Sequence, residues 1–255
     1  MSLVTRVLTV WKIADHEAFC SDPGGNPEQL LRLAQYASQY PDALGLLLAA
    51  NPGMPMDGIL LLTRFYPLEV SVNPAFRMRI AIEPAFLSSL SRTIQRRLVR
   101  RQGVDERLIR QLAGPRNRSV GVRAAAARNP DCPMDLLEDY PRHAWPVRAA
   151  LASNPSLPLA LQLRLAQDPK RQVRKALSVR DPVDEAVLNV LCHSTQHPLV
   201  LRGIARNPST PDNLLDELMV WGPTEVKNII QARRVTPEQL TRFAEAQMLS
   251  MLLPS

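Results

Sequence analysis

The stretch that indicates the fold is VRAAAARNP at residues 122–130, and it returns as VRAALASNP at 147–155. Weaker copies read VRKALSVRD at 173–181, LRGIARNP at 201–208 and VKNIIQARR at 226–234. The basic residue of each copy advances in steps of 25, 26, 28 and 25 positions. Self-similarity at such a period is typical of a repeat architecture.

Proline positions divide each copy into two short helices. A residue that precedes proline is pushed out of the α region, so the basic helix should end at its Asn-Pro corner. A second proline follows at Pro133, Pro158 and Pro211, and proline suits the first turn of a new helix. Leu161 and Leu165 then show helical spacing. Neither helix can bury its apolar stripe alone, so neighbouring copies must stack.

The pattern V-R-x-x-x-A-x-N-P-x-x-P-x-x-L-L resembles the leucine-rich repeat variant family, a relative of the HEAT and armadillo repeats. The resemblance is good at 122–137, 147–165 and 200–218, and partial at 173–191 and 226–244. It implies a right-handed superhelix in which α-helices alternate with short 3₁₀ or α segments, and it implies a scaffold without a reaction. The family is also associated with an N-terminal cysteine-rich iron–sulfur segment. This chain has only Cys20 there, so we expect no cofactor.

We therefore expect an all-α fold, a right-handed α-α superhelix of about eight two-helix repeats that forms a single solenoid over residues 1–255. Weaker corners at Asn51-Pro52 and Asn73-Pro74 extend the pattern toward the N-terminus. The expected parts are an N-terminal cap (1–50), degenerate repeats (51–121), regular repeats (122–245) and a C-terminal tail (246–255).

Composition limits the class of protein. The chain is 45% hydrophobic with a net charge of +7, which suits a packed core and an anionic partner. Its three cysteines, Cys20, Cys132 and Cys192, form no disulfide framework and favour a reducing cytoplasm. The first residues lack the features of a signal peptide, and prolines interrupt the most apolar region, 44–62. We expect a cytoplasmic protein without a membrane span.

Stacking would align the basic residues of the copies into a column, which consists of Arg123, Arg148, Arg174, Arg202 and Lys227. Such a column could bind a phosphate backbone or an acidic peptide. The repeat alone also explains it, because an arginine here can bond the last carbonyls of a helix or a nearby acid such as Asp168. The structural interpretation is favoured, and binding remains the alternative.

A second cationic feature is not explained by the repeat. Residues 92–128 contain eleven arginines, opposed only by Asp105 and Glu106, so this stretch carries +9. Within it we expect Arg96, Arg97, Arg100 and Arg101 to share one helix side. They form either a solvated face or an anion-binding patch. No aromatic residue lies between Phe86 and Tyr140, so contact with nucleic acid would be to the backbone.

Catalytic and metal-binding signals are weak. Cys192, His193 and His197 lie close together but lack a visible fourth ligand, which disfavours zinc. No nucleophile-elbow, phosphate-loop or zinc-protease motif occurs. Asp139, Tyr140 and Trp145 form the nearest set for a base-excision enzyme on a helical scaffold, without a link to a reaction.

The sequence thus predicts a scaffold that is not an enzyme and binds a protein partner through its concave face. The alternative is a nucleic-acid-binding protein that contacts a duplex backbone through its arginines. We expect no cofactor, no metal and no evident small-molecule site.

Overall fold

The computed structural model describes residues 13–234, with side chains from residue 17 onward, and this part of the chain is all α-helical. No strand occurs within those residues, so the predicted all-α class is confirmed. The chain divides into two compact units, Met1–Ser156 and Leu157–Ser255. The predicted tail (246–255), the end of the predicted regular repeats (235–245) and the start of the predicted cap (1–12) lie outside the described residues.

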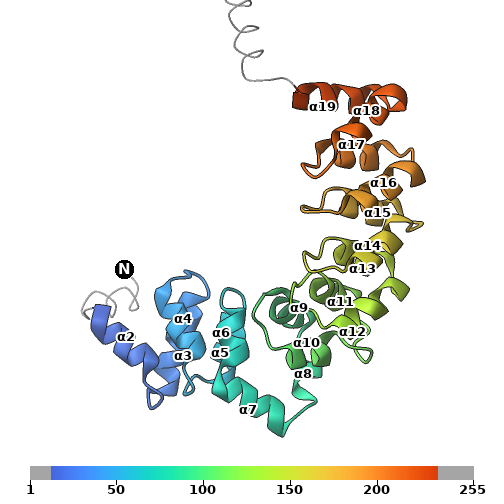
Figure 1. Cartoon of the computed structure of the whole chain (residues 1–255). Helices are drawn as coiled ribbons and strands as arrows, with labels where there is room; N and C mark the ends of the chain where they lie inside the picture. Colours follow the sequence, from blue (N-terminus) through green and yellow to red (C-terminus); the bar gives the residue numbers. More distant parts are fainter. Residues whose placement is uncertain (1–12, 235–255) are drawn as a thin grey trace, which may run out of the picture. The chain divides into compact units, whose positions relative to one another are not determined.

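Short helices make up both units (Figure 1). The first unit contains α2 (Ile13–Ser21), α3 (Pro27–Ala37), α4 (Ala43–Ala50), α5 (Met56–Leu62), α6 (Pro67–Val72), α7 (Pro74–Ile82), α8 (Phe86–Ser89), α9 (Arg92–Arg100), α10 (Glu106–Ala113), α11 (Val120–Ala127), α12 (Met134–Asp139), the 3₁₀ helix η1 (Tyr140–Arg142) and α13 (Trp145–Ala152). The second contains α14 (Leu159–Ala166), α15 (Arg171–Ser178), α16 (Glu185–Ser194), α17 (Pro198–Arg206), α18 (Asp212–Trp221) and α19 (Thr224–Arg234).

Helices that are separated by one or two others along the chain pack side by side in both units. In the first unit α2 contacts α4, α4 contacts α6, α6 contacts α9, α9 contacts α11, and α11 contacts α13. In the second, α15 contacts α17 and α17 contacts α19. We call these helices the corner row, because the Asn-Pro corners lie at their ends. The other helices pair in the same way, α3 with α5 and α14 with α16. This stacking buries the apolar stripes that single short helices cannot bury.

A buried asparagine at the corner joins one corner-row helix to the one before it. Asn129, which is 1% exposed, donates from Nδ2 to the backbone oxygens of Val99 and Arg101, both at 2.9 Å. Its Oδ1 accepts the backbone N–H of Asp131 at 2.9 Å. One amide side chain thereby satisfies two carbonyls at the end of α9, which have no partner within the helix, and shapes its own turn.

The same arrangement recurs at other corners in both units. Nδ2 in each case donates to two backbone oxygens that lie 22–31 residues earlier, at distances of 2.6–3.0 Å. All of these side chains are 3% exposed or less. They are Asn51, Asn73, Asn154 and Asn207. The corner backbone is extended where proline follows, with ψ near 118–126° at Asn51, Asn73 and Asn207.

Arginine replaces asparagine at the last described corner. Arg233 Nη1 donates to the oxygens of Ala205, at 3.4 Å, and Asn207, at 2.7 Å. Its Nη2 donates to Pro208 and Thr210 at 3.2 and 3.4 Å. These carbonyls lie one corner earlier, so a guanidinium performs the same bridging role as the amide. The bridging contact is therefore present at a corner where the Asn-Pro signal is lost.

The regular order is interrupted between residues 74 and 91. Asn73 ends α6 and also caps α7, because its Oδ1 accepts the N–H groups of Ala75 and Phe76 at 2.9 and 3.2 Å. A helix therefore starts directly at Pro74, with no intervening turn. Met78 and Ile82 on α7 are 64% and 74% exposed. This interruption lies within residues 51–121, for which the sequence predicts degenerate repeats.

We predict that Asn207→Asp destabilises the fold by at least about 2 kcal/mol. The change keeps Oδ1, which accepts the N–H of Ser209, but it removes both N–H donors and places a carboxylate against the oxygens of Ser178 and Arg180. Urea unfolding followed by circular dichroism measures the loss.

Asn213→Asp is the matched control, because Asn213 is exposed in the first turn of α18 and should tolerate the same change within about 0.5 kcal/mol. Equal losses in the two variants would show that the corner bonds do not stabilise the fold.

Candidate binding groove

The arginines of α9 follow from its amphipathic pattern. Gln95, Leu98 and Val99 are buried, and Arg96 and Arg100, four residues apart, are exposed on the opposite side. Ser91 caps the helix by accepting the N–H of Ile94 at 3.4 Å. Cations near the C-terminal end of a helix are favoured by its dipole, which suits Arg97 and Arg100. The helix is thus stable with its cations directed away from the core.

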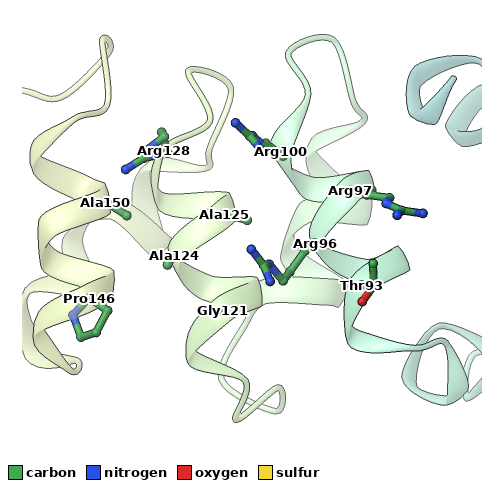
Figure 2. A pocket seen from close by; sticks show the side chains of 10 residues that line it. All are labelled: Thr93, Arg96, Arg97, Arg100, Gly121, Ala124, Ala125, Arg128, Pro146 and Ala150. Atoms are coloured by element: carbon green, nitrogen blue, oxygen red, sulfur yellow. The ribbon is translucent and has the colours of Figure 1, made fainter. Parts of the chain in front are cut away.

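Four arginines gather in one hollow of about 410 Å³ along the corner row of the first unit. Arg96, Arg97 and Arg100 come from α9, and Arg128 follows the end of α11 (Figure 2). Pro146 and Ala150 of α13 complete one side. We call this hollow the arginine groove. None of its lining residues is acidic, so its local charge is positive.

Small residues on α11 make the space. Gly121, Ala124 and Ala125 line the groove opposite α9 (Figure 2). A Cβ at Gly121 would lie 3.4 Å from Cδ of Arg96, so that side chain reaches across to α11. Longer side chains at these positions would fill the space between the arginines. The alanine-rich run that identified the repeat therefore also opens the groove.

Within the described residues, the guanidinium groups of these four arginines make no ion pair and no hydrogen bond. Other cations of the Arg-rich stretch are engaged. Arg110 pairs with Asp135 at 3.1 Å and with Glu106 at 2.8 Å, and its pKa is raised, chiefly by the hydrogen bond with Asp135. Asp105 pairs with Arg77 at 3.0 Å. The two acidic residues of the stretch thus pair with arginines outside the groove. The positive charge of the groove is left to solvent or a ligand.

A second hollow, of about 640 Å³, adjoins the arginine groove and shares Thr93 and Arg97 with it. Leu31 of α3 and Leu60 and Leu61 of α5 line it, and we call it the leucine hollow. Leu61 is 41% exposed. Asp57 and Arg64 lie at its polar side. A cationic surface therefore continues directly into an apolar one within the same unit.

The predicted cation column lies near the turns that precede its helices. Arg123 donates to the oxygen of Pro115 at 3.1 Å, and Arg148 to that of His143 at 2.7 Å. Arg174 donates to the backbone oxygen of Asp168, where a carboxylate partner had been expected, and to Oγ1 of Thr195. These contacts match the structural interpretation of the column.

The last two members of the column also have partners. Arg202 pairs with Glu225, with Nη1 3.3 Å from Oε2, and its side chain is 36% exposed. Lys227 Nζ donates to the oxygen of Val220 at 3.0 Å. Both lie in the second unit, and neither lines the arginine groove.

Arg101 does not join the other three predicted arginines in the groove. It follows the last residue of α9 with extended backbone, and its carbonyl accepts from Asn129. It thus occupies the corner position that asparagine holds elsewhere. Counted from the corners, Arg100 and Arg128 hold equivalent positions, because Arg100 directly precedes Arg101 and Arg128 directly precedes Asn129. Alignment on the corners would have revealed Arg128, which the predicted site omitted.

The cysteine and histidine residues that suggested zinc have other contacts. Cys192 is buried, whereas Nδ1 of His193 lies 2.8 Å from the oxygen of Asn189 and Nε2 lies 3.1 Å from Glu217. His197 caps α17 through Nδ1, which accepts the N–H of Leu199. No group of three His, Cys, Asp or Glu side chains that could hold a metal ion occurs within the described part of the chain.

Asp139 and His143 form the pair closest to an acid–base arrangement. Arg123 Nη1 lies 2.8 Å from Nδ1 of His143, and a guanidinium can only donate, so Nδ1 accepts. Nε2 then carries the proton and donates to Asp139 at 2.7 Å, and this bond lowers the pKa of the carboxyl group. Both imidazole nitrogens are occupied. Tyr140 is buried, and its pKa is raised by burial.

No family model, curated protein or solved structure matches this chain. None of the helices in residues 13–234 combines the length and apolar character needed to cross a membrane.

Burial holds the three thiols in their protonated form. It raises the pKa from 9.0 to about 11 at Cys20 and to about 12 at Cys132 and Cys192. A reactive cysteine needs the opposite shift. Unfolded thiols lose their protons above pH 9.0, so the unfolded state then binds fewer protons than the folded state.

We predict that the free energy of unfolding falls as pH rises beyond about 9, by up to ~1.4 kcal/mol per pH unit for each thiol. Urea unfolding between pH 8 and pH 10 measures the slope. Cys132→Ala should reduce the slope, whatever it does to stability at neutral pH. An unchanged slope would contradict the assignment of the effect to this thiol.

Proposed function

We propose that this protein is a non-enzymatic helical-repeat scaffold that binds a protein partner through the arginine groove. The observation that carries the proposal is a set of four arginines that line one hollow without a counter-ion from the described chain. Like charges at close range repel one another, and an anionic partner removes that cost. We further propose the α-α superhelical solenoid of about eight units that the resemblance to leucine-rich repeat variants implies, because the corner rows continue where the motif has decayed.

Binding to a duplex backbone is the competing function. It needs cations spread along a surface, since affinity rises with the number of phosphates that are neutralised. The column that would supply them is largely engaged, because four of its five members donate to backbone oxygens. The arginine groove gathers four arginines around one hollow, an arrangement that is better suited to a short acidic segment than to a long duplex.

The contacts of potential catalytic groups support a non-catalytic role. The thiols are buried and protonated, and the imidazole of His143 is held on both nitrogens. Free, buried cysteines are also what a reducing compartment such as the cytoplasm favours, and we propose that location.

We predict that a triple variant, Arg96→Glu, Arg100→Glu and Arg128→Glu, loses the protein partner of the wild-type chain. Charge reversal in the groove replaces attraction by repulsion, so recovery should fall by at least about tenfold. The measurement is quantitative mass spectrometry after affinity capture with the full tagged chain from native extract.

The matched control reverses Arg107, Arg116 and Arg118, which are exposed, belong to the same Arg-rich stretch and do not line the groove. It introduces the same total charge and should retain the partner. Equal recovery by both triple variants, or no stoichiometric partner for the wild type, would argue against the proposed function.

A further inference from the structure

We infer that the groove recognises an acidic peptide segment whose carboxylates lie next to large apolar side chains. The inference rests on the proposed function and specifies the chemistry of the partner. It follows from two adjacent surfaces of the first unit, the arginine groove and the leucine hollow, which share Thr93 and Arg97.

The arginine groove selects for acidic groups. Arg96, in the middle of α9, and Arg100 and Arg128, at the ends of α9 and α11, line one hollow (Figure 2). A guanidinium binds a carboxylate with two parallel hydrogen bonds, so several acidic side chains can be held side by side. Because the residues opposite are Gly121, Ala124 and Ala125, the backbone of a ligand can approach α11 closely.

The leucine hollow selects for apolar groups. Leu31 and Leu60 are half-buried and Leu61 is exposed, so an apolar side chain placed there would cover surface that water now contacts. Asp57 and Arg64 also line this hollow and have opposite charges, so its cationic character is weaker than that of the arginine groove. The two hollows therefore impose an order on the ligand, with acidic residues over α9 and α11 and apolar residues over α3 and α5.

This combination favours a polypeptide over nucleic acid. No aromatic side chain lines either hollow, so bases would find no stacking surface. Leucine side chains next to the arginines do not contribute to binding a phosphate backbone, whereas peptides commonly present acidic and apolar side chains together. The cationic groove and the adjacent leucine hollow together favour a segment of a partner protein that carries both acidic and apolar side chains.

The test uses the full chain and two fluorescein-labelled parent peptides. One is acetyl-Glu-Glu-Glu-Leu-Leu-Ser, and the other has the same residues in reverse order, so that both chain directions are tested. Their counterparts replace each Glu by Gln or each Leu by Ser. Fluorescence anisotropy should show binding that weakens as salt is raised. Each counterpart should bind at least about tenfold more weakly than the parent, because each loses one of the two recognised features.

Two variants with matched controls place the peptide. Arg100→Glu should weaken binding about tenfold or more, whereas Arg107→Glu should leave it unchanged. Leu61→Glu should weaken binding as well, whereas Leu46→Glu should not, because Leu46 is equally exposed but does not line the hollow. Unchanged melting temperatures show that a loss of binding is not a loss of fold.

The outcomes separate this inference from the function on which it rests. Groove-dependent capture of a partner together with no peptide binding would overturn the acidic-apolar chemistry and leave the scaffold function standing. Equal binding of the parent and Ser-for-Leu peptides would also overturn the role of the leucine hollow. Binding of a labelled duplex of about 20 base pairs in place of the peptide, lost in Arg100→Glu, would overturn both.

Discussion

The buried side-chain amide at the corner is the interaction on which the stacking depends. A short helix leaves its last carbonyls without partners, and in a stacked array those carbonyls are shielded from water. Asn129 satisfies two of them from the next corner and places its own turn at the same time. Because Asn154 then bonds the carbonyl of Asn129 itself, successive corners are linked within the unit. An apolar residue at this place would leave those carbonyls buried without a donor.

The corner bonds also explain how a binding surface arises from a repeat. Because they align each corner-row helix with the one before it in the same way, equivalent positions of neighbouring copies lie together. Arg100 and Arg128 are equivalent and therefore line the same hollow. One copy later, the positions equivalent to Arg96 and Arg97 are held by Ala124 and Ala125, and these short side chains leave room for the long ones. Departure from the repeat at a few positions is thus enough to produce a local site on a regular framework.

The arginines of this protein divide by what lies within reach of their guanidinium groups. Those near a turn or a carboxylate, such as Arg123, Arg110 and Arg233, bond to it and hold helices together. Those of the arginine groove face small apolar side chains that offer no acceptor, and their charge remains available. Identical residues therefore contribute to stability at one place and form a candidate binding site at another.

The sequence by itself determined the all-α class, the two-helix unit and the corners, because these depend on local physics: proline geometry, helical spacing of leucines and the run of alanines that permits close packing. It also located the excess of positive charge at 92–128. Only the tertiary structure decided which arginines are engaged. It placed Arg128 in the groove and Arg101 at a corner, and it showed Arg233 in the role of an asparagine. These assignments depend on groups of different helices, such as corner carbonyls that lie 22 or more positions away in the chain, and those groups meet only when the helices stack.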